Sequence, residues 1–213
     1  MKSIPLSLTA LALLAAGAAS ASVTPDSYDM LNGNTGSYTY WDETYSGAGC
    51  VTCDNALLTG GKGDLTDGII ASDNWFVTEA PAGNGPYVGW TLDPTIVFHF
   101  AATTAVRAVT FYFDDSNGAG GVSAPAGVVV DGTLFVVAEP AGSAPFAFTA
   151  SGLSFNGNDL SVTLIRKNAW VFLSEVQFAD AGSGAVPEPG SVGLLLAGLV
   201  GMGAAATRRR KPA

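Results

Sequence analysis

Positively charged residues are scarce in the central part of the chain. Of the nine Lys and Arg in 213 residues, four lie between positions 22 and 181: Lys62, Arg107, Arg166 and Lys167. The same stretch carries seventeen Asp and Glu, which gives it a net charge near −13. A surface this acidic repels phosphate backbones, so we expect no nucleic-acid partner. The charge suits divalent cations and solubility outside the cell.

Long apolar runs are missing from this central part and occur only near the two ends. Residues 190–207 are eighteen residues without a charge. As a helix they span about 27 Å, close to a hydrocarbon core about 30 Å thick. Four basic residues follow as a cytoplasmic stop: Arg208, Arg209, Arg210 and Lys211. We predict a transmembrane helix at 190–207 and a cytoplasmic tail at 208–213; a buried core helix is the alternative.

The other apolar run has the pattern of a secretory signal peptide. Lys2 precedes an apolar stretch at 6–18, and Ala19, Ser20 and Ala21 form a small-residue cleavage site. We predict a signal peptide at 1–21, cleaved after Ala21, and export of the part that follows.

The C-terminal part resembles the PEP-CTERM family of exported bacterial proteins. The resemblance is carried by the apolar run, the basic tail and a motif at the end of the 182–189 linker: Val186, Pro187, Glu188 and Pro189. It implies an exosortase as partner, contact with inner-membrane lipid, and sorting to the surface of a Gram-negative bacterium that makes exopolysaccharide. A permanent anchor on a proline-stiffened stalk is the alternative.

Residues 22–181 read as one all-β domain. Runs rich in β-branched and aromatic residues, with turn formers between them, occur at 95–100, 106–113, 127–132, 134–137, 160–165 and 170–178. An Asp-Gly pair at 131–132 predicts a hairpin. No helical period is evident. Short strands of this kind indicate a sandwich or barrel.

The body also resembles a galactose-binding-like, or discoidin-like, domain over about residues 55–180. The ordered segments that carry the resemblance are 65–68, 89–90, 96–100, 106–109, 128–132 and 170–178. It implies a jelly-roll-type β-sandwich. Residues 22–55 have no counterpart in it, and the terminal cysteines usual in the family are absent. Tyr38, Tyr40, Trp41 and Tyr45 in this segment form an added strand or a contact surface.

The family resemblance implies a structural calcium site at the loop 63–68. By position, its side-chain ligands are Asp67 and Glu175, with Asp64 and Asp73 as nearby alternatives. Calcium takes six to eight hard oxygen ligands, so two carboxylates and loop carbonyls are a plausible shell. The alternative is a turn in which Asp67 bonds to its own backbone.

Cysteine and histidine are nearly absent, which narrows the chemistry. Cys50 and Cys53 are the two cysteines, and export favours a disulfide that stiffens a short loop. Free or intermolecular thiols and a metal or redox centre are the alternatives. Zinc needs about four ligands, and His99 is the one further soft candidate. His99 is either a strand residue or a general base whose partner the sequence does not reveal.

No catalytic residue can be assigned. The sequence has neither a Gly-x-Ser-x-Gly elbow nor a His-Glu-x-x-His motif, and no spacing selects a glycosidase carboxylate pair. The preferred ligand contacts are Trp75 and Tyr87, which lie in loop-like sequence, and Arg107. Trp90 and Trp170 are expected in the core.

These features together predict a non-catalytic protein of the cell surface or biofilm matrix. It is exported through the inner membrane, anchored there and then processed. Its sandwich is expected to bind carbohydrate or extracellular polysaccharide. A structural or adhesive protein without a small ligand is the runner-up, and a secreted hydrolase ranks last.

Overall fold

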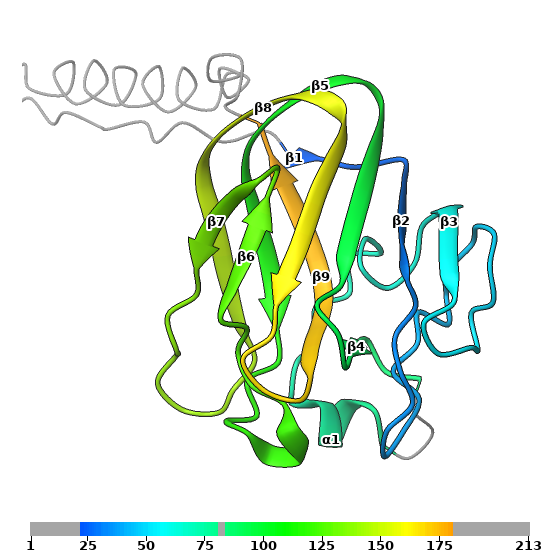
Figure 1. Ribbon diagram of the computed structural model, residues 1–213, viewed down its shortest axis with the longest axis vertical. Coiled ribbons are helices and arrows are strands. Elements are labelled where there is room, and N and C mark those ends of the chain that lie inside the picture. The colour runs from blue at the N-terminus through cyan, green and yellow to red at the C-terminus, as the bar shows by residue number, and fades with distance from the viewer. Residues whose placement is uncertain (1–21, 81–83, 181–213) are drawn as a thin grey trace, which may run out of the picture. The chain divides into compact units, whose positions relative to one another are not determined.

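Nine strands and two short helical turns make up residues 22–80 and 84–180, the part of the chain that the computed structural model describes (Figure 1). The strands are β1 (Ser22–Val23), β2 (Ser27–Leu31), β3 (Leu57–Gly61), β4 (Val88–Trp90), β5 (Thr95–Phe113), β6 (Gly127–Val130), β7 (Thr133–Val136), β8 (Phe146–Ile165) and β9 (Val171–Ala179). The helical turns are α1 (Trp75–Thr78) and η1 (Ala119–Gly121). The strands form one continuous antiparallel sheet that folds over into two layers, so the predicted all-β, jelly-roll-type sandwich is confirmed.

The long strands β5 and β8 pass through both layers. Residues 95–99 of β5 pair with β2 and with the end of β8. From Thr104 onward β5 pairs with the beginning of β8, and from Ala108 also with β9. The register shifts between His99 and Thr104, where both strands arch over one end of the sandwich (Figure 1). The sequence indicated two separate strands here because each half has its own apolar period.

Alternating side chains of β5 fill the space between the layers. Ile96, Phe98 and Phe100 are at most 6% exposed, as their spacing predicts. In the second half, Val109, Phe111 and Phe113 are fully buried, and simple alternation would place Arg107 on the same buried face. A register shift between Val106 and Ala108 changes the phase of the strand there, so Val106 is buried and Arg107 is half-buried at the edge of the core.

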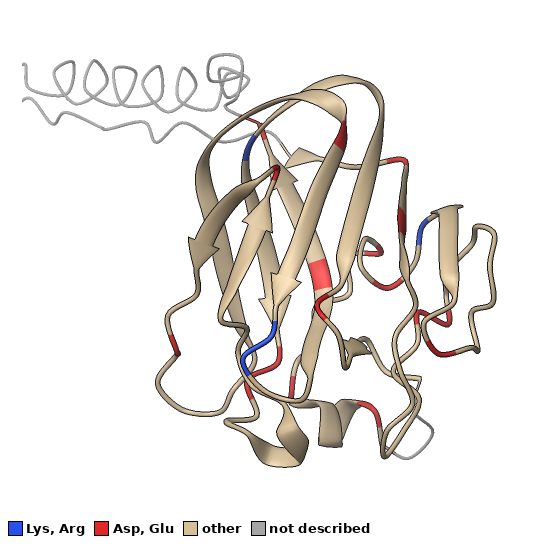
Figure 2. Ribbon diagram, viewed as in Figure 1, with Lys and Arg blue, Asp and Glu red and all other residues tan. Residues whose placement is uncertain are grey.

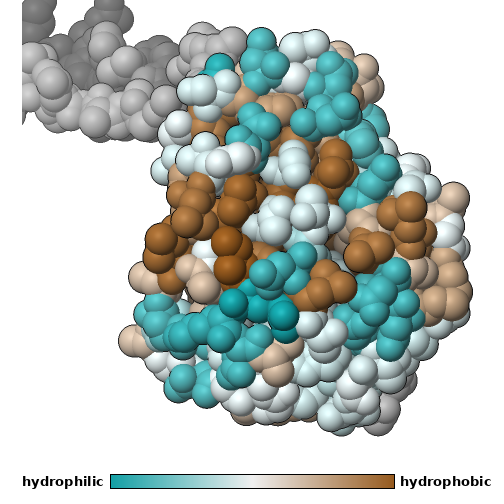
Figure 3. Space-filling view, viewed as in Figure 1, coloured by the Kyte–Doolittle hydropathy of each residue, from teal (hydrophilic) through white to brown (hydrophobic). Residues whose placement is uncertain are grey.

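The hairpin of β6 and β7 turns at Asp131 and Gly132, which have φ of 47° and 79°. This confirms the predicted Asp-Gly turn. β7 is the last strand of its layer, and its Leu134 and Val136 are 57% and 74% exposed. Apolar side chains accordingly gather over β6 and β7 in the space-filling view (Figure 3).

The segment between β2 and β3 is built into the core. Tyr40 and Tyr45 are 2% and 6% exposed. Tyr45 donates a hydrogen bond to the carbonyl of Tyr28 and accepts one from the amide of Gly61, so it joins β2 to β3. Residues 22–55, which the sequence left without a role, therefore complete one layer and close one end of the sandwich.

The first and last strands lie side by side, since Ser22 of β1 pairs with Ala179 of β9. Within residues 22–80 and 84–180, no helix combines the length and the apolar character needed to cross a membrane. Four of the sequence-based assignments lie outside the described residues: the signal peptide (1–21), the linker with its motif (182–189), the transmembrane helix (190–207) and the tail (208–213).

Candidate functional site

An open pocket of about 460 Å³ lies where the loops that follow β2, β3 and α1 meet. Its volume is in the range of small-ligand sites, about 300–1,000 Å³. Carboxylate, hydroxyl and amide groups share its wall with two apolar side chains. The lining residues are Glu43, Thr44, Asp64, Asp67, Ile69, Asn84, Gly85 and Pro86. We call this site the carboxylate pocket.

Asp64 anchors the wall of the carboxylate pocket, with Asp42 directly behind it. Asp64 is 6% exposed, and its Oδ1 accepts a hydrogen bond from the Thr44 hydroxyl at 2.5 Å. Asp42 is fully buried; its Oδ1 accepts the Asp64 amide at 3.0 Å and its Oδ2 accepts the Tyr28 hydroxyl. A Cβ on Gly63 would lie 2.1 Å from Asp42 Oδ1, so this close approach requires glycine. The two carboxylates are thus held close together in the fold.

Burial without a cationic partner raises the pKa of these acids. Desolvation, and then the charge of Asp42, raise the pKa of Asp64 to about 7. Desolvation raises the pKa of Asp42 to about 6, although the Tyr28 hydroxyl opposes the shift. Acidic positions gather around β2, β3 and the adjoining loops in Figure 2, and Lys62 is the one Lys or Arg between residues 22 and 80.

Glu79 shapes the opposite wall of the carboxylate pocket. Its two carboxylate oxygens accept the backbone amides of Gly85 and Tyr87, at 2.8 and 3.1 Å. A Cβ on Gly85 would approach Glu79 Oε1 to 2.4 Å. Burial raises the pKa of Glu79 to about 7. Glu79 is therefore a positioning residue that holds the Asn84 to Pro86 stretch in place.

Asp67 and Glu175, predicted as calcium ligands, do come together. Glu175 is 4% exposed, and its Oε2 accepts the amide of Gly68 at 3.2 Å. Burial raises the pKa of Glu175 to about 7, and the charge of Asp67 adds to the shift. The hydroxyl oxygen of Thr66 is buried beside them without a hydrogen-bond partner, and all three residues line a second pocket of about 310 Å³.

These three residues fit a hard cation, since they supply two carboxylates and an unsatisfied hydroxyl oxygen. The described residues contain no group of three His, Cys, Asp or Glu arranged to hold a metal ion. The remaining ligands of such a cation would be backbone carbonyls or water. The alternative turn also forms, because Asp67 Oδ1 accepts the amide of Ile69 at 2.7 Å.

The structure places the two loop aromatics in an apolar cluster at the α1 end. Tyr87 is 1% exposed and its hydroxyl donates to the carbonyl of Asp73 at 3.0 Å, so its ring offers no face to a ligand. Trp75 is half-buried and packs edge-on against Tyr40 and Phe172. Tyr87 is therefore a packing residue, whereas Trp75 packs on the same cluster with part of its side chain exposed.

Arg107 lies apart from this cluster. Its guanidinium donates to the carbonyl of Phe155 at 2.7 Å, where β5 and β8 pair beyond the bulge. The backbone amide of Trp75 instead donates a hydrogen bond to Asp114, which directly follows the last residue of β5. The structure therefore does not bring Trp75, Tyr87 and Arg107 together as one site.

Trp90 and Trp170 differ from each other in burial. Trp90 is fully buried, as expected for a core residue, and its indole N–H donates to the carbonyl of Leu31 at 2.7 Å. Trp170 is half-buried at the α1 end and packs edge-on against Tyr40 and Phe172.

His99 has two carboxylate partners that sequence reasoning missed. Its Nδ1 lies 2.7 Å from Asp159 and its Nε2 lies 3.3 Å from Asp29. The hydrogen bond to Asp159 raises the pKa of His99, and Asp29 adds to this. The partners come from β2 and β8, which flank β5 on either side, so only strand pairing reveals them.

Cys50 and Cys53 form the predicted disulfide. Asn32 fixes the loop that they close, because its amide nitrogen faces the carbonyls of Cys50 and Val51 at 3.3 and 3.0 Å. The oxygen of the same side chain accepts the amide of Asp42 at 2.9 Å. Asn32 thus connects the disulfide loop to the wall of the carboxylate pocket.

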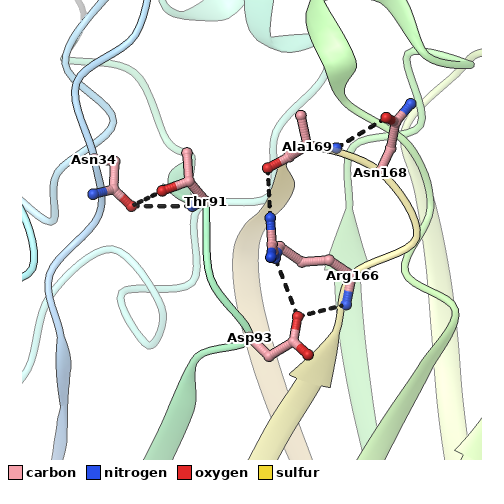
Figure 4. A network of polar contacts seen from close by, with 6 residues as sticks. All are labelled: Asn34, Thr91, Asp93, Arg166, Asn168 and Ala169. Carbon is pink, nitrogen blue, oxygen red and sulfur yellow. Dashed lines mark hydrogen bonds and ion pairs between the residues drawn. The ribbon is translucent and has the colours of Figure 1, made fainter.

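Arg166 and Lys167 have partners away from the carboxylate pocket. Arg166 donates through Nε to Asp93 at 3.1 Å and through Nη1 to the carbonyl of Ala169 at 2.8 Å, in a network that Figure 4 shows beside the Asn34–Thr91 contact. Lys167 pairs with Glu139 at 2.5 Å. Within the described residues, none of the ion pairs involves a carboxylate of the pocket.

A family model described as the PEP-CTERM protein-sorting motif matches residues 185–211. The chain carries a PEP-CTERM sorting motif. The match contains the Val-Pro-Glu-Pro sequence at 186–189 and the basic stop at 208–211, which confirms the resemblance seen in the sequence. The motif indicates export and membrane-linked sorting in bacteria.

Several solved structures are similar to the chain. SpGH29 is 12% identical with a TM-score of 0.35, over 56% of this chain and 24% of that one. The family 32 CBM from C. perfringens NanJ in complex with galactose is 11% identical with a TM-score of 0.31, over 52% and 87%. CBM32 of AlyQ in complex with 4,5-unsaturated mannuronic acid is 13% identical with a TM-score of 0.32, over 52% and 91%. The chain thus spans about a quarter of the length of SpGH29. No curated protein sequence matches it.

Sequence reasoning missed most of the residues that build the carboxylate pocket. Asp42, Glu43, Glu79 and Asn84 were not singled out, and Asp64 was named only as an alternative calcium ligand. One signal was available: the acids between residues 22 and 80 greatly outnumber the cations. Their convergence depends on contacts such as Asp42 to Asp64, which are 22 positions apart.

Proposed function

We propose that this chain is an exported surface protein whose β-sandwich binds carbohydrate at the carboxylate pocket without catalysing a reaction. After export through the inner membrane of a Gram-negative bacterium, an exosortase would recognise the PEP-CTERM motif and release the domain to the cell surface or biofilm matrix. Its binding partner there would be extracellular polysaccharide.

The open pocket of about 460 Å³ carries this proposal. Sugars present hydroxyl groups that donate hydrogen bonds and C–H faces that pack on apolar surfaces. The pocket supplies acceptors in Glu43, Asp64 and Asp67, an amide in Asn84 and apolar surface in Ile69 and Pro86. Such a mixture of apolar wall and few directed polar groups is typical of small-ligand sites.

Binding of the full chain, purified in detergent, to a panel of neutral, acidic and amino polysaccharides tests the proposal. We expect at least one polysaccharide to bind, and Asn84→Ala to weaken that binding by about tenfold, the loss of one or two directed hydrogen bonds. The matched control is Asn156→Ala, which removes an exposed amide side chain from β8, outside the pocket. Absence of binding across the panel would favour the structural or adhesive role instead.

A hydrolase is the second candidate, and one observation favours it. Asp64 has a pKa of about 7 in an open pocket beside Asp67, and a glycosidase acid needs a raised pKa next to a second carboxylate. Incubation of bound oligosaccharide with the chain separates the two functions. Release of new reducing ends that is lost in Asp64→Asn would establish catalysis, whereas intact oligosaccharide is expected from a binding domain.

We also propose that Asp67 and Glu175 hold a structural calcium ion together with the Thr66 hydroxyl. The support is the buried, uncompensated carboxylate of Glu175 and the unpartnered oxygen of Thr66 in one pocket wall. Calcium there would order the 63–68 loop that also forms part of the carboxylate pocket.

A further inference from the structure

We propose that the carboxylate pocket selects sugars that carry a protonated amine, such as the glucosamine units of a deacetylated polysaccharide. The inference rests on the proposed carbohydrate binding at this pocket and narrows its ligand class. Neutral sugars, uronic acids and basic peptides are the competing ligands.

The charged side chains on and directly behind the wall of the pocket are all acidic, and Asp67 is the one among them that is also the proposed calcium ligand. Glu43, Asp64 and Asp67 lie on its wall, and Asp42 and Glu79 lie directly behind the wall. No Lys or Arg is among the described lining residues. A uronic acid would add a further negative charge to this group, whereas an ammonium group offsets part of the existing repulsion. Charge complementarity therefore favours a cationic ligand.

The second carboxylate oxygen of Asp64 also favours a ligand that donates hydrogen bonds. Asp64 is more than nine-tenths buried, and its Oδ1 is occupied by the Thr44 hydroxyl. Its Oδ2 accepts no hydrogen bond from any residue of 22–80 or 84–180, although the side chain forms part of the pocket wall. An ammonium group has three N–H donors and no acceptor, so it matches a free carboxylate oxygen.

The size and lining of the pocket separate a sugar from a bare ion. About 460 Å³ is far more than one cation fills, since a single water accounts for about 30 Å³ in the liquid. Ile69 is 58% exposed at the rim, and together with Pro86 it offers an apolar surface to the C–H face of a sugar ring. Asn84 can both donate to and accept from ring hydroxyls.

The burial of Asp64 also strengthens its contact with an ammonium group. Hydrogen bonds between an ammonium donor and a carboxylate are roughly twice as strong as neutral ones. Asp64 lies in a largely desolvated position, where such bonds are weakened less by salt than at an open surface. An N-acetylated sugar keeps the shape of the ligand but loses the charge, so it should bind much more weakly.

Calorimetric titration of the full chain at about pH 7 with two oligosaccharides tests this inference. One is a glucosamine tetramer and the other is the same tetramer fully N-acetylated. We expect the amine form to bind at least about tenfold more tightly, the range of one charge-assisted hydrogen bond. Asp64→Asn should remove this preference. Asp131→Asn is the matched control, because it removes one acidic charge at the exposed β6–β7 turn, where asparagine tolerates the positive φ.

Each outcome decides the inference. Equal affinity for the two tetramers, or tighter binding of the acetylated one, would overturn it while leaving carbohydrate binding intact. A neutral or acidic polysaccharide that binds through Asn84 while the glucosamine tetramer does not would also overturn it. Tight binding of an oligolysine with the same sensitivity to Asp64→Asn would assign the pocket to basic peptides. Failure of every sugar would refute the proposed function itself.

Discussion

At the Arg166 corner every charge has a partner, whereas in the carboxylate pocket several acids share one region without a cation. Asp93 receives the guanidinium of Arg166 at 3.1 Å, and the rest of that side chain is held by the carbonyl of Ala169. Asp42 instead accepts the backbone amide of Asp64. Burial raises the pKa of both carboxyls, and the charge of Asp42 raises that of Asp64 further. A buried charge with a partner of opposite sign stabilises the fold locally. A buried charge without such a partner is unfavourable, and binding of a proton, a metal ion or a cationic ligand relieves that cost.

The largest expected difference between the two regions is in how their contribution to stability depends on pH. Asp42, Asp64, Glu79 and Glu175 all have raised pKa values, of about 6 or 7, in the folded state. The stability that they contribute is therefore complete below about pH 4 and is lost as the pH rises through 6 to 7. We expect the free energy of unfolding to fall by at least about 3 kcal/mol between pH 5 and pH 8.

Urea denaturation of the full chain at pH 5, 6, 7 and 8 measures this slope. Arg166→Ala should keep the slope unchanged, because the corner does not titrate in this range. Constant stability between pH 5 and pH 8 would show that the charges of these acids are compensated in the fold.

Removal of the buried acid behind the pocket should have the next largest effect. Asp42→Ala leaves the Tyr28 hydroxyl and the Asp64 amide without an acceptor in the interior. We expect a loss of about 3 kcal/mol at pH 5, which a shift in the urea midpoint would report. Asp93→Ala, in the half-exposed pair, is the comparison variant. If both variants lost the same stability, the distinction between the two regions would not hold.

Calcium should stabilise the domain by a similar or smaller amount. At a concentration about 100-fold above its Kd, a ligand of the folded state adds about 2.7 kcal/mol. The effect should be greater at pH 8 than at pH 6, because binding needs the ionised form of Glu175, whose pKa is about 7.

Thermal melting with calcium, and again with a chelator, checks this expectation. Glu175→Gln should remove the shift, and Asp131→Asn should retain it. An unchanged melting temperature at both pH values would eliminate the calcium site.

The smallest effect is expected at the Arg166 corner. The side chains of Arg166 and Asp93 are 27% and 50% exposed, so solvent screens their attraction. Arg166→Ala should cost about 1 kcal/mol or less in urea denaturation. A loss above about 2 kcal/mol would mean that the network of Figure 4 stabilises the fold far more than its exposure implies.

Local patterns were enough to predict the strands and the β6–β7 turn. Ile96, Phe98 and Phe100 alternate because one face of β5 is buried, and Asp131 and Gly132 adopt the positive φ that their turn requires. The disulfide also followed from local spacing and export. The bulge beside Arg107 was not predictable from alternation, because it depends on how β5 pairs with its neighbours.

The candidate site was much harder to predict. Glu175 meets Gly68 across 107 positions, and that contact followed only from the family resemblance. Asp42 and Glu79 act through backbone amides of distant loops, and no local pattern marks such contacts. Tyr87 was chosen for its loop-like sequence, yet it is buried in the core, where its backbone amide donates a hydrogen bond to Glu79.

Carbon-13 NMR titration of the Asp64 side-chain carboxyl, with and without the glucosamine tetramer, tests the central claim most directly. We expect a midpoint near the pKa of about 7 in the free chain and a clear downward shift when the amine binds. A midpoint close to 4 in the free chain, unaffected by the tetramer, would contradict both the uncompensated charge and its use in ligand selection.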